Sequence, residues 1–403
     1  MESYVARQPI FDSNHQLAAY ELLYRTSSEN IFPQVDGDVA TSTLLSSAFL
    51  GFDINELSNN KVVFINFTEQ LLLQDTPRLF PKNKIVVEVL EDVSATPEIQ
   101  EKLEQLSADG YTIALDDFEY TPELEPLIRC ASIIKFDFRL TPSSEIEKVI
   151  NQLKKYNIQF LAEKVESYDE FNKARELGCT LFQGYFFCRP EVLGSRDLGP
   201  SKMNMIQLLG HIYDENYEIE TIERLINSDV GLSYKLLRYI NSSLFSTQRE
   251  ISSIRHAVAF LGIMETRRFI SLLLLAEQEE RATNELIATS IIRAKFCECL
   301  CQVATIRLDA NEMFLLGLFS ELDTILGTDM TTIMELLPLS KSIKQALIQQ
   351  EGPLWPYLEL TRKYETGDWD GASNICSELS VNEHELPRSY EAAVKLSNRL
   401  INA

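Results

Sequence analysis

Residues 113–118 read IALDDF, a short apolar run that ends in two adjacent carboxylates, Asp116 and Asp117. This pattern is typical of a buried parallel strand that emerges at the mouth of a barrel. Two like charges at the end of an apolar run are costly unless a cation, a shared proton or a lysine offsets them. The rest of the chain therefore has to supply a partner for this pair.

Strand and helix patterns alternate through the first half of the chain. Residues 4–11 and 16–25 alternate apolar and polar side chains around a four-residue turn, which predicts a β-hairpin. Further strands are predicted at residues 61–67, 85–91, 113–117, 133–137, 159–166 and 180–185, and helices at residues 39–50, 69–73, 97–108, 144–156 and 168–177. This alternation implies a parallel sheet, and the number of strands favours an α/β fold of the TIM-like (β/α) barrel type.

Polar residues fall in or at the end of the apolar runs of these strands. They are Glu21, Asn66, Glu88, Asp116, Asp117, Lys135, Glu163 and Gln183. Active sites of such barrels lie at the C-terminal ends of the strands. We therefore expect these side chains to converge on one mouth.

The residue types of this set favour a hard cation. Carboxylate and amide oxygens without imidazole or thiolate suit Mg²⁺ or Mn²⁺ better than zinc, and the first 200 residues contain a single histidine, His15. The carboxylates are more than one ion needs. Two ions could lower the pKa of a bridging water and clamp the oxygens of a phosphodiester. Lys135 and Arg25 are candidates to neutralise the phosphate charge.

The second half of the chain has a helical pattern. At 403 residues the chain suits two domains, and residues 191–202, with two glycines and a proline, read as a linker. Apolar stripes with helical period occur at residues 229–240 and 253–262, the latter ending on Gly262, and helices are also predicted at 313–319, 330–337 and 390–401. We expect an all-helical second domain.

Composition excludes some partners. The chain has 37 basic and 60 acidic side chains and a formal net charge of −23, which opposes direct binding to nucleic acid or to an anionic membrane. No stretch reads as a signal peptide or is long enough to span a bilayer. Seven scattered cysteines fit a reducing compartment, so we expect a soluble, cytoplasmic protein without membrane insertion.

The order of these motifs resembles that of a known barrel family. Residues 21–25 (ELLYR) are similar to E-A-L-x-R, Glu88 and Glu91 to a pair of glutamates three apart, and residues 116–118 to D-D-F. Asn66, Lys135, residues 162–166 (AEKVE) and residues 183–185 (QGY) match further motifs in the same order. On these motifs, residues 1–195 resemble the EAL domain, the cyclic di-GMP-specific phosphodiesterase barrel.

The resemblance implies roles for the matching residues. In that family, the matches to Glu21, Asn66, Glu88 and Asp116 ligate one metal ion, and the match to Asp117 helps to hold a second. Cofactors would be Mg²⁺ or Mn²⁺, as two ions, and the substrate cyclic di-GMP. The implied catalytic residues are Lys135, Glu163 and Asp117, and the implied substrate-binding residues are Leu23, Arg25 and Gln183.

Two departures from the family pattern lie beside these residues. In the family a glycine-rich loop follows the residue that matches Phe118, whereas here the next residues are Glu119, Tyr120, Thr121 and Pro122. The loop must therefore run differently. Glu91, whose match in the family braces this loop, would lose its partner. Lys164 replaces a glycine next to Glu163. This substitution points to altered geometry or to an added salt bridge.

Residues 196–403 resemble the HDOD domain, an all-helical relative of the HD phosphohydrolases. The matching signatures lie at residues 227–245 and 253–262, the latter fitting S-I-x-H-A-V-x-x-L-G. The histidine–aspartate pair of HD enzymes would lie in a helix at residues 317–322 and is absent from the sequence. The resemblance implies a regulatory or partner-binding module, and the whole chain resembles two-domain EAL–HDOD signalling proteins of bacteria, for which a homodimer is a possible assembly.

Three functional hypotheses follow. The first is a metal-dependent phosphodiesterase that opens cyclic di-GMP to linear pGpG, regulated by the helical domain. The second is a weak or inactive barrel that serves as a cyclic di-GMP receptor, and the third is a protein-interaction scaffold. A barrel lyase or aldolase with Lys135 as a Schiff base is a weaker alternative, because it leaves the surplus of carboxylates unexplained.

Overall fold

The computed structural model describes residues 4–25, 54–184, 253–276, 284–304 and 308–401, with isolated positions between 206 and 251. The helix predicted at residues 39–50 and the linker at 191–202 lie outside these residues. Within the described part of the chain, no helix is both long and apolar enough to cross a bilayer.

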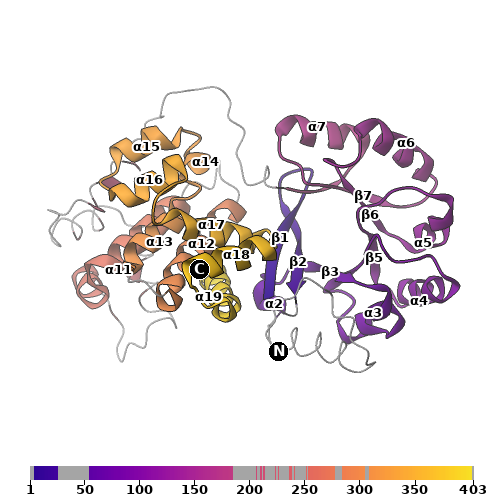
Figure 1. Cartoon of the computed structure of the whole chain (residues 1–403), viewed down its shortest axis with the longest axis horizontal. Helices are drawn as coiled ribbons and strands as arrows, with labels where there is room; N and C mark the ends of the chain where they lie inside the picture. Colours follow the sequence, from indigo (N-terminus) through magenta and orange to yellow (C-terminus); the bar gives the residue numbers. More distant parts are fainter. Residues whose placement is uncertain are drawn as a thin grey trace. The chain divides into compact units, whose positions relative to one another are not determined.

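Eight strands close into a barrel in sequence order, which confirms the predicted (β/α) barrel (Figure 1). They are β1 (Tyr4–Asp12), β2 (Leu17–Arg25), β3 (Val62–Phe67), β4 (Ile85–Val89), β5 (Thr112–Leu115), β6 (Ile133–Asp137), β7 (Gln159–Glu163) and β8 (Leu181–Gln183). Strand β1 runs antiparallel to both of its neighbours, β2 and β8, and every other neighbouring pair is parallel. The C-terminal ends of β2–β8 therefore share one mouth.

The predicted β-hairpin formed by β1 and β2 is confirmed, and it contains a β-bulge. Ile10 pairs with Ala19, whereas the next residue, Phe11, pairs with Leu17, so Ala18 is extra on β2. The bulge shifts the pairing by one residue, and such a shift decides which side chains face the barrel interior. As a result Gln8 lies opposite Glu21.

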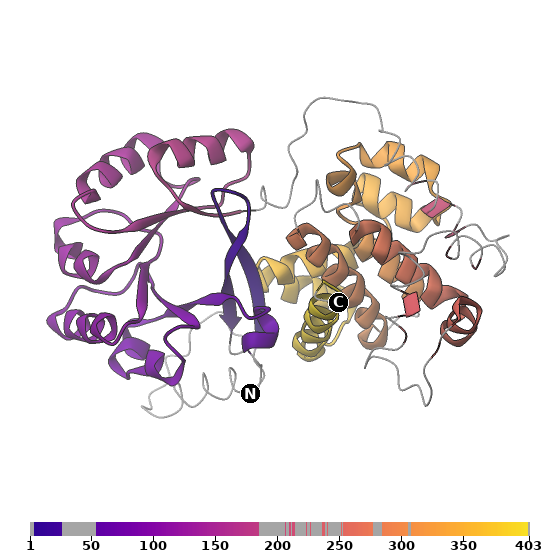
Figure 2. The ribbon, with the colours of Figure 1, turned by 180° about the vertical axis from the view of Figure 1, so that it is seen from behind.

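Helices surround the barrel on its outside (Figure 2). They are α2 (Ile54–Leu57), α3 (Glu69–Leu73), α4 (Pro97–Ala108), α5 (Glu125–Cys130), α6 (Ser143–Leu153) and α7 (Tyr168–Leu177), with short 3₁₀ turns η1 (Thr76–Leu79) and η2 (Pro122–Leu124). Their ends follow local chemistry: Thr96 caps α4 with Pro97 at its first position, and Ser167 and Glu170 form a capping box at the start of α7. Between β5 and β6, where the sequence analysis predicts no helix, the chain forms η2 and α5.

An apolar layer fills the barrel interior. One inward-facing side chain from each of seven strands forms it, and Leu181 of β8 packs against it. The members are Ile10, Ala19, Phe64, Val86, Ala114, Ile133 and Leu161. Because side chains alternate along a strand, the residue two positions further toward the mouth on each strand also points inward.

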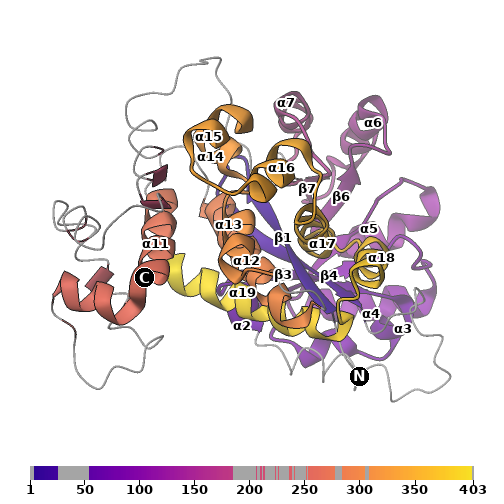
Figure 3. The same ribbon diagram turned by 60° about the vertical axis from the view of Figure 1, so that its left-hand side comes forward.

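The helical unit of the chain contains α11 (Ile254–Ala276), α12 (Asn284–Val303), α13 (Ala310–Leu318), α14 (Leu322–Leu326), α15 (Met330–Leu336) and α16 (Lys341–Gln349) (Figure 3). The predicted stop at Gly262 appears as a kink, because Gly262 has a φ of 77° inside α11. The single helix expected over residues 317–322 is wrong: α13 ends at Leu318, and Glu321 is the N-cap of α14.

The last helices of the chain are α17 (Trp355–Glu365), α18 (Trp369–Leu379), the 3₁₀ turn η4 (Glu383–Glu385) and α19 (Leu386–Ile401). Helix α19 packs on β1 and α2: Lys395 forms an ion pair with Glu56 at 3.1 Å, and Arg7 donates a hydrogen bond to Asn398 Oδ1 at 3.4 Å. The ring of Tyr364 lies 5.1 Å from the rings of both Trp369 and Tyr390, which joins α17 to α18 and α19.

The chain divides into two compact units. The first comprises residues 1–189, 303–305 and 359–403, and the second comprises residues 190–302 and 306–358. The division thus falls within α17, and the helices that follow it belong with the barrel. The domain boundary at residues 195 and 196 lies outside the described residues and stays a prediction.

Candidate metal centre

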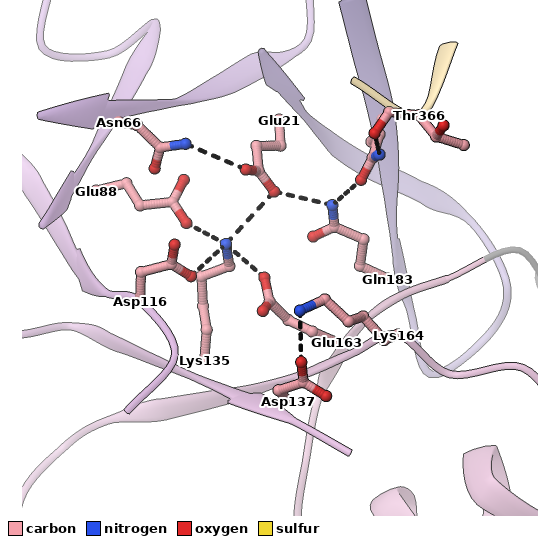
Figure 4. A network of polar contacts seen from close by, with 11 residues as sticks. Glu21, Asn66, Glu88, Asp116, Lys135, Asp137, Glu163, Lys164, Gln183 and Thr366 are labelled. Carbon is pink, nitrogen blue, oxygen red and sulfur yellow. Dashed lines mark hydrogen bonds and ion pairs between the residues drawn. The ribbon is translucent and has the colours of Figure 1, made fainter. Parts of the chain in front are cut away.

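Each strand places one polar side chain directly above the apolar layer. Every one of these residues is two positions, on the mouth side, from the residue of its strand that belongs to the layer or, on β8, packs against it. The eight residues, which we call the polar ring, are Gln8, Glu21, Asn66, Glu88, Asp116, Lys135, Glu163 and Gln183. Figure 4 labels all of them except Gln8. The expectation that the predicted residues converge is met by the seven of them that belong to this ring.

Lys135 lies at the centre of the ring. Its Nζ is 2.5 Å from Glu163 Oε1, 2.9 Å from Asp116 Oδ1 and 3.4 Å from Glu21 Oε2, and it also pairs with Glu88. The Lys135 side chain is 1% exposed and that of Glu88 is fully buried. One ammonium group therefore faces four carboxylates in a site with little access to water.

Amide side chains hold Glu21 from both sides. Asn66 donates from Nδ2 to Glu21 Oε1 at 3.4 Å, and Gln183 donates from Nε2 to Glu21 Oε2 at 2.8 Å. The same nitrogen of Gln183 donates to Gln8 Oε1, also at 2.8 Å. These bonds fix the direction of the Glu21 carboxylate.

The charges of the ring shift the pKa values of its members. Burial, together with the neighbouring carboxylates, raises the pKa of Glu88 well above its usual range and that of Glu163 to about 8, although Lys135 opposes both shifts. Burial alone would lower the pKa of Lys135, but the four carboxylates outweigh it and hold that pKa well above its ordinary value. The ring is therefore short of positive charge.

The donor set of the ring fits a divalent cation. Asn66 Oδ1, Glu88 Oε2 and Gln183 Oε1 are buried oxygens that accept no hydrogen bond. In the described part of the chain, two groups bring carboxylate oxygens within 4.8 Å of one another: Glu21, Glu88 and Glu163, and Asp116, Asp117 and Glu163. Buried oxygens without donors, next to a surplus of carboxylates, are what a hard cation such as Mg²⁺ or Mn²⁺ can satisfy.

The remaining predicted residues lie at the edge of the ring. Asp117 follows the ring member Asp116 and is half-buried, with a φ of 37°, and burial and Asp116 raise its pKa. Leu23 is half-buried and sits one inward position beyond Glu21 on β2. Arg25 ends β2, where its backbone pairs with Tyr4, and its side chain is outside the described part.

The loop after Asp117 is anchored although it lacks glycine. The Phe118 N–H donates to the Lys135 carbonyl at 3.0 Å, and the buried Phe118 ring meets Phe136 edge-on at 6.3 Å. Pro122 then begins η2. Glu91 is exposed.

The salt bridge expected from Lys164 is present. Lys164 Nζ pairs with the buried carboxylate of Asp137, whose pKa is lowered because this ion pair and two backbone N–H groups outweigh its burial. Lys164 adopts a φ of 54°, in the left-handed region that glycine occupies readily. The substitution therefore combines strained backbone with an added ion pair at the rim of the ring.

Gln8 is the ring member that the sequence analysis missed. If the pairing of Phe11 with Leu17 continued without a bulge, Gln8 would lie opposite Tyr20, which points outward. The bulge between Ile10 and Phe11 moves Gln8 opposite Glu21 instead. Gln8 and Ile10 are two residues apart on β1, so their side chains point to the same face. This spacing is the signal from which the inward position of Gln8 could have been predicted.

The helical unit holds a different buried cluster where HD enzymes would carry their histidine–aspartate pair. Arg293 of α12 forms an ion pair with Glu321, and both are buried. Arg293 also donates to Ser320 Oγ at 3.3 Å, and Thr324 donates to Glu321 Oε2 at 3.3 Å. A Cβ on Gly317 would lie 2.2 Å from the Arg293 carbonyl, so the two helices touch at this glycine.

Comparison with known proteins places the chain in a family. A sequence profile described as the EAL domain matches residues 2–190, and one described as the HDOD domain matches residues 200–335. The cyclic di-GMP phosphodiesterase CdgJ of Vibrio cholerae serotype O1 is 36% identical over 405 residues, which cover 99% of this chain and 94% of CdgJ. The chain belongs to the EAL–HDOD family.

Another relative matches the EAL–HDOD chain over its whole length: the uncharacterized protein YuxH of Bacillus subtilis (strain 168) is 36% identical over 411 residues, 100% of both chains. Among solved structures, the calcium and cyclic di-GMP complex of Klebsiella pneumoniae BlrP1 has a TM-score of 0.39 and 20% identity, covering 47% of this chain and 56% of that chain. The cyclic di-GMP complex of the phosphodiesterase PaMucR has a TM-score of 0.37 and 22% identity, covering 47% and 97%.

Proposed function

We propose that the EAL barrel of this chain is a phosphodiesterase that hydrolyses cyclic di-GMP to linear pGpG with Mg²⁺ or Mn²⁺. The observation that carries the proposal is the polar ring, in which four carboxylates share one lysine and buried oxygens lack donors. The 36% identity to a protein named as a cyclic di-GMP phosphodiesterase supports this substrate.

The residues of the ring divide into those that hold the cation and those that face the substrate. Glu21, Asn66, Glu88 and Asp116 would hold one ion and Asp117 part of a second, and the ions would lower the pKa of a bound water and offset phosphate charge. Glu163, which pairs with Lys135 in the ring, is proposed as a catalytic residue that accepts or donates a proton. The Lys135 ammonium is proposed to neutralise a phosphate at the mouth.

We propose that the nucleotide binds at the rim of the barrel mouth. Leu23, Arg25 and Gln183 are proposed to contact cyclic di-GMP, and Arg25, as a guanidinium, suits a phosphate. The helical domain is proposed to regulate the barrel or to bind a protein partner. A homodimer and a cytoplasmic location also remain proposals.

The test is incubation of the purified chain with cyclic di-GMP and Mg²⁺ or Mn²⁺, followed by chromatography for pGpG. Product should form only with the metal, and Glu21→Ala or Asp116→Ala should abolish it through loss of metal binding. Glu176→Ala, which removes an exposed glutamate of α7, is the matched control and should retain activity. An active Glu21→Ala protein would overturn the site.

A cyclic di-GMP receptor is the second candidate. It is favoured by the sequence after Phe118, where the loop beside Asp117 lacks the glycines of the family pattern. The same incubation separates the two functions when nucleotide binding is recorded in parallel. Micromolar binding, worth about 8 kcal/mol, without any product would make the chain a receptor.

A further inference from the structure

The C-terminal helices reach the polar ring at the turn between α17 and α18. The backbone carbonyl of Thr366, in this turn, accepts a hydrogen bond from Gln8 Nε2 at 3.2 Å (Figure 4). Residues 359–403 belong to the same compact unit as the barrel, so this contact lies within one unit. Both domain profiles end well before Thr366.

The contact sets the orientation of two further side chains. A carbonyl can only accept, so Gln8 must turn its NH₂ group toward Thr366 and its oxygen toward Gln183. Gln183 must then present its own NH₂ group to Gln8, and it donates from the same nitrogen to Glu21 Oε2, at 2.8 Å in both cases. Gln183 Oε1 is left without a donor, as this orientation requires.

The turn itself is held rigidly. Gly367 has a φ of 70°, and the Asp368 N–H donates to the Lys363 carbonyl at 2.9 Å, which is the closing bond of a Schellman motif. The Asp368 carboxylate pairs with Lys363 at 2.7 Å and caps α18 through the N–H of Gly371. The Thr366 carbonyl is therefore fixed in place by its own helix ends.

The same turn also touches the predicted nucleotide-binding edge. A Cβ added to Gly367 would lie 2.6 Å from Leu23 Cδ1. Leu23 lies on β2 two residues beyond Glu21. A change in the turn thus meets the mouth at two neighbouring points, through Gln8 and through Leu23.

We propose that the α17–α18 turn is a positioning element for the metal ligand Glu21, and that Gln8 is the positioning residue through which it acts. The inference rests on the proposed function, because it gives Glu21 the role of a metal ligand. Displacing the turn frees the Gln8 amide to rotate, which releases Gln183 and lets the Glu21 carboxylate turn away from the other ligands. Second-layer partners of this kind change metal affinity without touching the metal.

The test measures Mn²⁺ affinity of the full chain by calorimetry, together with kcat and KM for cyclic di-GMP. Gln8→Met keeps the side-chain volume and removes both hydrogen bonds, and it should weaken Mn²⁺ binding roughly tenfold. Gly367→Ala displaces the turn without replacing any residue of the ring, and it should weaken Mn²⁺ binding and raise KM. Gly178→Ala is the matched control, because Gly178 also has a positive φ, of 107°, but no atom within 4 Å of an added Cβ.

If Gly367→Ala acts through Gln8, its effect on Mn²⁺ affinity and that of Gln8→Met should not be additive. The double variant Gln8→Met/Gly367→Ala should bind Mn²⁺ no more weakly than the weaker-binding single variant, whereas independent effects would multiply. If the wild-type chain binds Mn²⁺ and forms pGpG while both single variants match Gly178→Ala, the inference fails and the proposed function stands. Multiplied effects also overturn it. If the wild-type chain binds neither Mn²⁺ nor Mg²⁺, both proposals fall.

Discussion

The barrel and the helical unit each bury charged side chains, and the two clusters differ in their balance. In the polar ring one lysine faces four carboxylates, and several buried oxygens accept no hydrogen bond. In the helical unit Arg293 forms an ion pair with Glu321, and Ser320 and Thr324 bind the same pair. The first cluster has a surplus of carboxylates around its cation, whereas the second is built on a pair of opposite charges, so burial of charge alone does not mark a binding site.

The largest difference between the two clusters is expected when the basic residue of each is replaced and the free energy of unfolding is measured with and without Mn²⁺. Breaking a buried ion pair on one side costs about 3–5 kcal/mol, so Lys135→Met should lower the free energy of unfolding by about that amount in metal-free buffer. Mn²⁺ should restore much of the loss, because it can occupy the centre of the same carboxylates. Urea unfolding with and without Mn²⁺ measures both effects.

Arg293→Met provides the comparison in the helical unit. It should cost a similar amount, and Mn²⁺ should restore none of it, because the polar ring, and not this ion pair, gathers four carboxylates around one cation. Adding Glu321→Met to Arg293→Met should recover stability, since apolar replacement of a whole buried pair is often close to neutral. A metal response in Arg293→Met, or none in Lys135→Met, would erase the distinction between the clusters.

An effect of intermediate size is expected in the pH dependence of the melting temperature. The pKa of Glu163 is raised from 4.5 to about 8 in the folded chain. A raised carboxyl pKa means that the stability this group contributes is full below its unfolded pKa and is lost as the pH rises through about 8. The metal-free wild-type chain should therefore lose more melting temperature between about pH 5 and pH 8 than Glu163→Gln. Parallel curves for the two proteins would contradict the shift, and Glu176→Gln should follow the wild type.

The rim pair Lys164–Asp137 should give the smallest effect. The Lys164 side chain is 49% exposed, so the ion pair is screened by water and is worth about 1 kcal/mol or less. Lys164→Gly also relieves a positive φ, which offsets much of the loss, and the net change in unfolding free energy should stay within about 1 kcal/mol. Lys164→Ala loses the ion pair but keeps the backbone strain, so it should be less stable than Lys164→Gly. The reverse order in urea unfolding would refute the strain at this position.

The sequence predicts the barrel and most of its ring because both follow from local alternation. Glu88 stands two residues after Val86, and Glu163 two after Leu161, so inward-facing polar positions can be read directly from the strands. Gln8 escaped because its place opposite Glu21 depends on a bulge in β2, although its alternation with Ile10 on β1 already put it on the inward face. Its contact with Thr366 escaped because it joins opposite ends of the chain. The salt bridge of Lys164 followed from its charge, but its partner Asp137 had to be found in the structure.

The arrangement of the two units along the chain makes the helical unit an insertion into the barrel unit. Apart from residues 303–305, it occupies residues 190–358, between the last strand and the final helices of the barrel unit. An appended domain has one covalent joint, and an inserted one has two. The second joint here is the continuous helix α17, whose far end carries the turn at Thr366. The eleven residues of this helix form one regular hydrogen-bonded element, so the chain passes between the units here without a loop.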